Sequence, residues 1–428
     1  MRSATNIFFS FEVTPTSHGL AAYRERGGYG ALEKALKTLQ PAEVEKEVMT
    51  SGLQGRGGAG FSTGAKWSFV NKQSPVVYLC CNADEGEPGT FKDRWILEHS
   101  PHQLIEGILL AAYALRVRHA FIYIRGEFDL PLRRLQAALL EAREAGLVGE
   151  KILGTGFSCD IVVHRGAGAY VCGEESSLLN SLEGKKGYPR NKPPFPAVKG
   201  LYQRPTVVNN VETLSAVPWI ISNGGEKYAA IGVKKTPGTR LFSISGHVVR
   251  PGLYERPTGY PLHKLIFEDA GGMLGGKALK AVIPGGSSTP ILTPAEVETL
   301  TMDAESIAKL GSMLGSGGII VIAEGTCMVS LLQVLTRFYA HESCGQCTPC
   351  REGTDWMNRI MQRILAGHGV KGDLESLRNI PAGIMGNTIC ALGDAASMPV
   401  LGFIKKFGPE FEYFIEHGRS MNDGRLVV

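Results

Sequence analysis

Strand-like apolar runs alternate with helical patterns through the first half of the chain. The strand-like runs cover residues 76–81, 120–124 and 160–164. Apolar positions at helical spacing recur in residues 41–51, 102–117, 130–145 and 174–182. This alternation predicts an α/β domain with a parallel sheet and helices on its faces.

The pattern changes at about Thr239. The following segment contains short strands interrupted by Arg250-Pro251-Gly252, a helix near residues 261–270 and a strand near 280–283. These elements predict a small α+β module, and a strand at 319–323 follows. The last hundred residues are helical in pattern. Their predicted inner faces consist of Met328, Leu331, Leu332, Leu335, Phe338 and Tyr339, and of Trp356, Met357, Ile360, Met361 and Ile364. The predicted domains are 1–238, 239–327 and 328–428.

Three cysteines stand close together between the two terminal helical patterns. They are Cys344, Cys347 and Cys350, and Cys390 follows 40 residues later in a segment of helical character. A short loop that offers three thiolates, with a fourth from a separate stretch of chain, suits a [4Fe-4S] cluster. The motif therefore predicts electron transfer.

A structural zinc site is the alternative, because zinc also binds four cysteines. Zinc sites usually present two paired knuckles, whereas these cysteines divide three and one. The other five cysteines, Cys80, Cys81, Cys159, Cys172 and Cys327, have no ligand spacing and are expected to be small buried residues.

A glycine-rich loop with the pattern G-x-G-x-x-G follows the first predicted helix. It contains Gly55, Arg56, Gly57, Gly58 and Gly60. A dinucleotide fingerprint normally follows a strand, so this is no ordinary Rossmann turn. Glycine backbone can still approach a phosphate closely, and Lys66 could neutralise the same anion. The alternative is a plain flexible turn.

Polar residues cluster beyond the ends of predicted strands, where ligands bind in open α/β sheets. The first cluster follows the strand at 76–81 and contains Asn82, Asp84, Glu85 and Glu87, whose acids could instead be solvated loop charges. A second contains Tyr170, Gly173, Glu174 and Glu175, where the acids could simply cap a helix. A third patch is Asn209, Asn210 and Thr213.

Three phenylalanines flank these loops. Phe61 and Phe195 lie beside glycine-rich or Pro-Pro segments, where cores are rarely built, and Phe69 is close by in the sequence. Core packing is the ordinary role of phenylalanine, but stacking on an adenine is a reasonable use here.

Composition and charge exclude several other classes. The apolar fraction is 43% and the charged fraction 20%, as in folded soluble proteins. The net charge of +4 comes from scattered basic residues, so nucleic acid is not an expected partner. We identify neither a signal peptide nor a membrane-spanning run, and therefore expect a cytosolic or peripherally docked protein.

These motifs together resemble the flavoprotein of respiratory complex I, the 51 kDa or F-subunit family of NADH:quinone oxidoreductase. The similarity runs from about Gly27 to about Phe411. Its most specific marks are the loop at 55–61, residues 166–181 and the cysteine segment 342–353. The resemblance implies an FMN-binding α/β domain, a ubiquitin-like module and a helical bundle with a [4Fe-4S] cluster.

The resemblance also implies roles for individual residues. Phe61, Phe69 and Phe195 would stack on the adenine of NADH, and Glu87, Glu175 and Lys192 would contact the rest of the dinucleotide. The implied FMN ligands are Gly55, Gly57, Lys66, Asn82, Asp84, Tyr170, Glu174, Asn209, Asn210 and Thr213.

The implied activity is transfer of a hydride from NADH to FMN, followed by single-electron transfer to the cluster, with no catalytic acid or base. The implied partners are a thioredoxin-like [2Fe-2S] subunit and the large iron-sulfur subunit of the peripheral arm, on the cytoplasmic side of the inner membrane. No direct membrane insertion is expected. Residue chemistry alone leaves FMN or FAD, and NADH or NADPH, open.

Two alternative functions are compatible with the sequence. One is the diaphorase subunit of an NAD-linked hydrogenase or formate dehydrogenase. Such subunits often carry additional cysteines at either end, but this chain has none before Cys80 or after Cys390. The other is a non-catalytic, metal-stapled scaffold subunit.

Overall fold

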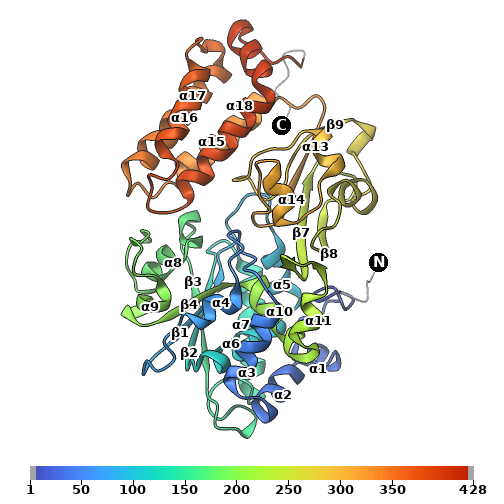
Figure 1. The fold of residues 1–428 in the computed structure, drawn as a ribbon, viewed down its shortest axis with the longest axis vertical. Coiled ribbons are helices and arrows are strands. Elements are labelled where there is room, and N and C mark those ends of the chain that lie inside the picture. Colours follow the sequence, from blue (N-terminus) through green and yellow to red (C-terminus); the bar gives the residue numbers. More distant parts are fainter. Residues whose placement is uncertain (1–5, 423–428) are drawn as a thin grey trace. The chain divides into compact units, whose positions relative to one another are not determined.

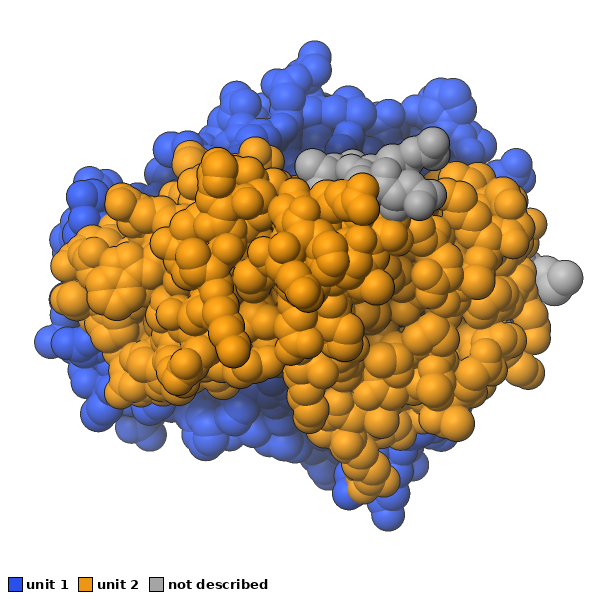
Figure 2. All heavy atoms as spheres, turned by 90° about the horizontal axis from the view of Figure 1, so that it is seen from above, with its two compact units in different colours: residues 1–86, 91–242, 255–259 blue, residues 87–90, 243–254, 260–428 orange. Residues whose placement is uncertain are grey.

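The structure is a computed structural model that describes residues 6–422. The chain forms two compact units, coloured separately in Figure 2. The first contains residues 1–86, 91–242 and 255–259, and the second contains 87–90, 243–254 and 260–428.

The first unit is built on a four-stranded parallel sheet. Its strands are β1 (Tyr78–Ala83), β2 (His119–Ile124), β3 (Asp160–Arg165) and β4 (Thr206–Asn210), in the order β3-β2-β1-β4. The parallel sheet and its first three strands were predicted correctly. The short β4 was not predicted as a strand, because it ends in two asparagines, a residue type depleted from strands.

Helices pack against this sheet and against one another (Figure 1). α6 (Pro101–Leu115) is almost wholly buried and packs on α10 (Val211–Asn223). A Cβ at Gly107 of α6 would lie 2.0 Å from the carbonyl oxygen of Leu214, so only glycine allows this approach. The remaining helices are α1 (Leu20–Glu25), α2 (Gly30–Thr38), α3 (Pro41–Thr50), α4 (Thr63–Ser68), α5 (Lys92–His99), α7 (Asp129–Glu144), α8 (Glu175–Leu182), α9 (Pro196–Lys199) and α11 (Gly225–Ala229).

The N-terminal segment is held by one buried carboxylate. The backbone N–H groups of Ile7, Phe8 and Phe9 donate to Glu255 at 2.7, 3.0 and 2.9 Å. Ile7 and Phe8 are buried. This segment, which no sequence pattern explained, is therefore part of the core of the first unit.

A mixed sheet with the strand order β8-β7-β10-β9 lies mainly in the second unit, although residues 239–242 of β7 and 255–257 of β8 are assigned to the first. Its strands are β7 (Thr239–Gly246), β8 (Gly252–Pro257), β9 (Leu279–Ile283) and β10 (Gly318–Ala323). β10 pairs parallel to β7 and antiparallel to β9. The accompanying short helices are α12 (Leu262–Lys264), continued by a π-helical turn at Leu265–Asp269, α13 (Pro294–Thr299) and α14 (Ala304–Lys309).

A helical bundle completes the second unit. It consists of α15 (Met328–Glu342), α16 (Thr348–Arg363), α17 (Asp373–Ile384) and α18 (Leu392–His417). Most residues of the predicted inner faces are buried or half-buried, but Trp356 is 53% exposed, so its assignment to the inner face was wrong. No helix among the described residues has the length and apolarity needed to cross a bilayer.

Candidate functional site

A cavity of about 840 Å³ lies in the first unit, beside the last residues of β1 and β4. The chain runs from β1 to β2 to β3 on one side of the sheet, and then returns to place β4 on the other side of β1. The cavity therefore lies at the point where the strand order reverses, the usual ligand position in open α/β sheets. The predicted site residues that line it are Gly55, Gly57, Gly60, Phe61, Lys66, Phe69, Asn82, Gly173, Glu174, Glu175, Lys192, Phe195, Asn209 and Asn210.

The glycine-rich loop forms one wall of this cavity. It is closed at its base, where Gly55 N donates to the carbonyl of Phe61 at 2.8 Å. A Cβ at Gly57 would lie 3.4 Å from Cβ of Asn210, so a side chain there would crowd the end of β4. Gly60 has φ 68°, which favours glycine. The loop follows α3 rather than a strand, as its sequence context predicted.

Two lysines and two glutamates form an ion-pair chain on another wall. Lys66 Nζ lies 3.1 Å from Glu175 and also donates to the carbonyl of Val208 at 3.1 Å. Lys192 Nζ bridges Glu174 and Glu175 at 2.8 and 3.0 Å. Burial alone would raise the pKa of Glu175, but the two ammonium groups outweigh it and hold that pKa below its usual value. Glu175 is therefore a stable anion in this cavity.

Glu174 caps a helix, which was the alternative to a role as a ligand. Its carboxylate accepts from the N–H groups of Ser176 and Ser177 at 2.8 and 3.0 Å, at the start of α8. Because Glu174 also lines the cavity, the two roles coexist.

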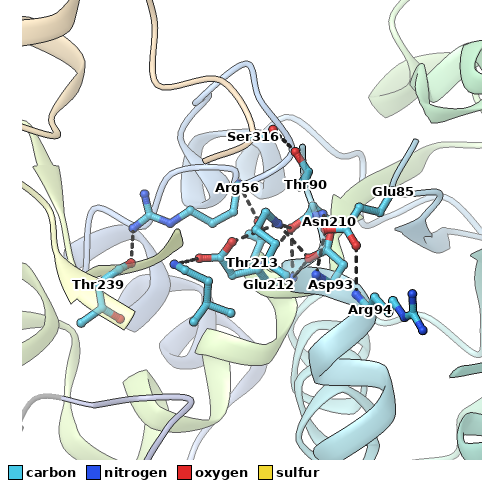
Figure 3. A network of polar contacts seen from close by, with 12 residues as sticks. Arg56, Glu85, Thr90, Asp93, Arg94, Asn210, Glu212, Thr213, Thr239 and Ser316 are labelled. Atoms are coloured by element: carbon cyan, nitrogen blue, oxygen red, sulfur yellow. Dashed lines mark hydrogen bonds and ion pairs between the residues drawn. The ribbon is translucent and has the colours of Figure 1, made fainter. Parts of the chain in front are cut away.

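A buried polar network supports the glycine-rich loop from within the unit (Figure 3). Arg56 does not line the cavity. Its guanidinium donates to the carbonyls of Pro237 and Thr239 at 2.9 and 3.0 Å. The backbone N–H of Arg56 donates to Thr213 Oγ1 at 2.8 Å. Arg56 and Thr213 thus brace the loop, and neither is among the lining residues.

The same network contains a fully buried lysine. Lys92 Nζ lies 2.8 Å from Asp93 and 2.9 Å from Glu212. Glu85, a predicted ligand, accepts from the N–H groups of Asp93 and Arg94 at 2.9 and 3.0 Å, at the start of α5. Burial, reinforced by the Asp93 carboxylate, raises the pKa of Glu85. In the described structure Glu85 holds α5 in place.

Other predicted ligands also fall outside the lining. They are Gly58, Asp84, Glu87 and Tyr170. Glu87 belongs to the second unit, where it accepts from Ser288 N at 2.7 Å. The assignment of all these residues as ligands stays a prediction.

The three phenylalanines are solvent-exposed, as expected for residues outside a core. Phe61, Phe69 and Phe195 are 51%, 63% and 57% exposed, and all three line the cavity. Sequence reasoning missed six lining residues, which carry no distinctive chemical signal: Ala59, Pro196, Ala197, Val198, Thr206 and Val208.

The lining suits FMN. Glycine backbone allows close approach of a phosphate, Lys66 provides a cation, and asparagine amides provide donors and acceptors for a polar ring edge. The volume is in the range of cofactor sites. The exposed phenylalanines provide an aromatic surface for a second ring.

The four motif cysteines belong to the helical bundle. Cys344 and Cys347 are half-buried in the loop between α15 and α16, and Cys350 is buried in the first turn of α16. Cys390 lies in the turn before α18, although its segment was expected to be helical. Burial raises the pKa of Cys350, whose Sγ lies 3.3 Å from Ser343 Oγ, and the nearby thiols of Cys347 and Cys344 raise it further.

This loop fits an iron-sulfur cluster by its donor set. Among the described residues no three Cys, His, Asp or Glu side chains converge on a position for one metal ion. A four-iron cluster has a different requirement, because its thiolates bind separate irons. The five other cysteines are all buried, as predicted.

Family models match three successive parts of the chain. A Nuo51 FMN-binding domain matches residues 48–219, an SLBB domain 240–322, and an NADH-ubiquinone oxidoreductase-F iron-sulfur binding region 330–414. The last range contains all four motif cysteines. The predicted FMN and [4Fe-4S] cofactors are therefore confirmed, and the zinc alternative is not supported. The α+β module is an SLBB domain.

Curated relatives match over nearly the whole chain. The second NADH-quinone oxidoreductase F subunit of Rhizobium meliloti (strain 1021) is 53% identical over 406 residues, which cover 95% of this chain and 96% of the relative. The F subunit of Rickettsia bellii (strain OSU 85-389) is 52% identical, and the match covers 94% of this chain and 96% of the relative. The F subunit of Mycobacterium bovis (strain ATCC BAA-935 / AF2122/97) is 49% identical, and the match covers 96% of this chain and 94% of the relative.

A solved structure shares the fold. A chain of an NAD⁺-reducing [NiFe]-hydrogenase in the air-oxidized state has a TM-score of 0.81 and 37% identity, and the match covers 94% of this chain and 65% of the hydrogenase chain. The curated relatives are more similar and match in length. This chain therefore belongs to the F-subunit (51 kDa) family of NADH-quinone oxidoreductase.

Proposed function

We propose that this chain oxidises NADH within respiratory complex I. When bound, FMN takes up the two electrons of a hydride and releases them singly, and a [4Fe-4S] cluster accepts one electron at a time. The observation that carries the proposal is the cavity at the strand-order reversal, whose lining combines glycine backbone, Lys66, amides and exposed phenylalanines.

The chain's own contribution is binding and orientation. The glycine-rich loop and Lys66 would hold FMN, and Phe61, Phe69 and Phe195 would stack on the adenine of NADH. Of the ion-paired residues, Glu175 and Lys192 would contact the rest of the dinucleotide, and Glu174 would help to hold FMN. Hydride transfer between stacked rings needs no general acid or base, so orientation is the principal demand on the protein.

We further propose that Cys344, Cys347, Cys350 and Cys390 are the cluster ligands. The proposed domains are 1–238 for FMN and NADH, 239–327 for the SLBB fold and 328–428 for the cluster. The proposed neighbours in the complex are a thioredoxin-like [2Fe-2S] subunit and the large iron-sulfur subunit of the peripheral arm. The proposed location is the cytoplasmic side of the inner membrane, attached through the complex.

The experiment is an absorption spectrum of anaerobically purified protein, with flavin and iron analysis, before and after NADH. We expect one FMN and about four irons per chain, and bleaching of the flavin band by NADH. A protein without flavin, or a flavin band that NADH leaves unchanged, would refute the proposal.

A second candidate function is the diaphorase subunit of an NAD-linked hydrogenase. The similarity to the [NiFe]-hydrogenase structure favours it. Affinity purification of the native complex separates the two functions: complex I predicts NADH oxidation coupled to quinone reduction, whereas a hydrogenase predicts hydrogen-dependent NAD⁺ reduction.

A further inference from the structure

Two adjacent asparagines end β4, and their side chains have different partners. Successive residues of a strand point to opposite faces of the sheet. Asn210 Nδ2 donates to Asp93 Oδ2 at 2.6 Å, and Asn210 Oδ1 accepts from the N–H of Glu212 at 2.9 Å, at the start of α10. Both ends of the Asn210 amide are therefore engaged within the protein.

Asn209 is engaged at one end. Its Oδ1 accepts from the indole Nε1 of Trp67 at 2.8 Å. No acceptor for Nδ2 is found within residues 6–422. Asn209 is 6% exposed and lines the cavity. The Asn209 side chain is therefore nearly buried in the cavity wall, and its Nδ2, which has no protein acceptor among the described residues, is available to donate to a ligand in the cavity.

Trp67 determines which atom of the Asn209 amide remains available to a ligand. The oxygen and nitrogen of an amide occupy nearly the same volume, so hydrogen-bond partners decide its orientation. An indole N–H can only donate, and therefore selects Oδ1. The remaining Nδ2 is then available as a donor. If the amide were reversed, the site would instead present an acceptor.

Trp67 is well placed for this role because it cannot easily move. It is fully buried, on the short helix α4 that follows the glycine-rich loop. Its neighbour Lys66 lines the cavity and bonds to the carbonyl of Val208, so α4 is joined to β4 at two consecutive residues. Trp67 is not among the lining residues.

We propose that Trp67 is a positioning residue of the flavin site, whose N–H fixes the Asn209 amide so that Nδ2 donates to FMN. The inference rests on the proposed function, since it needs FMN in this cavity. The competing explanation is that Asn209 only satisfies the buried indole and that Trp67 acts through core packing.

A double-mutant cycle on FMN affinity separates the two explanations. FMN is removed from the purified full-length chain, and its Kd is measured by flavin fluorescence for wild type, Trp67→Phe, Asn209→Ala and the double variant. We expect each single variant to raise Kd about tenfold, the scale of one hydrogen bond. The double variant should bind no more weakly than Asn209→Ala, because the indole acts through that amide.

Trp95→Phe is the matched control. It removes the same atoms from an indole that packs on Phe9, with ring centroids 4.6 Å apart, and that does not line the cavity. It should leave the Kd unchanged. With FMN saturating, Trp67→Phe should also leave the KM for NADH unchanged.

Two results would overturn the inference. The first is that Trp67→Phe binds FMN with the wild-type Kd. The second is that Trp67→Phe weakens FMN binding by the same factor in the wild-type and in the Asn209→Ala background, which is the result expected if Trp67 acts through core packing. If wild type itself binds no FMN, the proposed function fails instead. If Trp67→Phe does not fold, β-(3-benzothienyl)alanine at position 67 replaces N–H by sulfur with the same shape and tests the same expectation.

Discussion

Glu175 is the residue whose charge the cavity controls most directly. Lys66 and Lys192 hold its pKa below the ordinary value of 4.5. A carboxyl with a lowered folded-state pKa contributes stability above its unfolded pKa, and loses that contribution as pH falls through the folded value. The stabilisation should therefore be complete at neutral pH, begin to decline near pH 4.5 and be lost as the pH falls through the lower folded-state pKa.

Glu175→Gln tests this pH dependence. We expect it to lower the free energy of unfolding by about 1–2 kcal/mol at neutral pH, and by much less in acid. Urea unfolding followed by tryptophan fluorescence at about pH 7 and pH 3.5 measures the difference. Glu33→Gln, in an exposed pair with Lys37, is the control and should change little at either pH. An equal loss at both pH values would show that charge is not the cause.

Cys347 provides a test at the metal site. Cys347→Ser should lose iron because serine is a poor cluster ligand, while FMN remains and NADH still reduces it. Iron and sulfide analysis, flavin analysis and stopped-flow spectra measure the three quantities. Cys159→Ser, which alters a buried cysteine of the first unit, should keep its iron. Retention of a full cluster by Cys347→Ser would exclude Cys347 as a ligand.

Residue chemistry predicted much of the site, but not how its members divide their work. The glycine-rich loop after α3, Lys66 on α4 and the asparagines at the ends of β1 and β4 were sufficient to indicate the region of the cavity. Arg56 was indistinguishable from a ligand in sequence, yet Nη2 of its guanidinium donates to the carbonyls of residues about 180 positions later, and Arg56 does not line the cavity. Nothing in the sequence indicated that Trp67 contributes to the site, because a lone tryptophan in a helix is normally a residue of the hydrophobic core.

At the scale of elements, the closest helix contact depends on one glycine. Gly107→Ala in α6 would place a Cβ 2.0 Å from the Leu214 carbonyl oxygen, so α6 and α10 must separate. Since Asn210 caps α10 and lies in the cavity wall, this separation should reach the flavin site.

We expect Gly107→Ala to cost about 2 kcal/mol or more, with weaker FMN retention. Thermal unfolding and FMN release on dilution are the measurements. Gly383→Ala in α17 is the control, because its Cβ would meet nothing within 4 Å. Helix propensity predicts a gain of up to about 1 kcal/mol there. Similar destabilisation by both changes would argue against the close contact as the cause.

Long periodic elements were predicted from the sequence, and short or composite ones were not. α6 and α7 were recognised by their spacing, with ends displaced by one or two residues. β4 has five residues and α10 contains Pro218, so neither has a clear local signal. Both are stabilised by tertiary contacts with β1 and α6, which local sequence cannot reveal.

At the scale of the whole molecule, the two cofactor regions belong to different compact units. The flavin cavity lies in the first unit and the four motif cysteines in the second. The order of the two regions along the chain was predicted from the motifs. The exact limits of the domains stay a prediction.

Removal of the cluster should therefore affect the units unequally. Treatment with an oxidant and an iron chelator should increase amide hydrogen exchange in the cysteine loop and in α16, because the chain there loses its cross-link. Exchange in α6 and FMN content should remain as before. Hydrogen-exchange mass spectrometry of treated and untreated protein measures this, and equal loss of protection in α6 would contradict independent units.

The return of β4 to the side of β1 has a consequence for biosynthesis. On the ribosome, β1, β2 and β3 emerge first and can pair while the chain is still growing, since domains fold as their residues appear. The wall made by Val208, Asn209 and Asn210 arrives some 40 residues after β3, and Glu255, which holds the N-terminal segment, arrives later still. A nascent chain thus has no complete flavin pocket until about half of it has been translated, and FMN loading must follow the synthesis of β4.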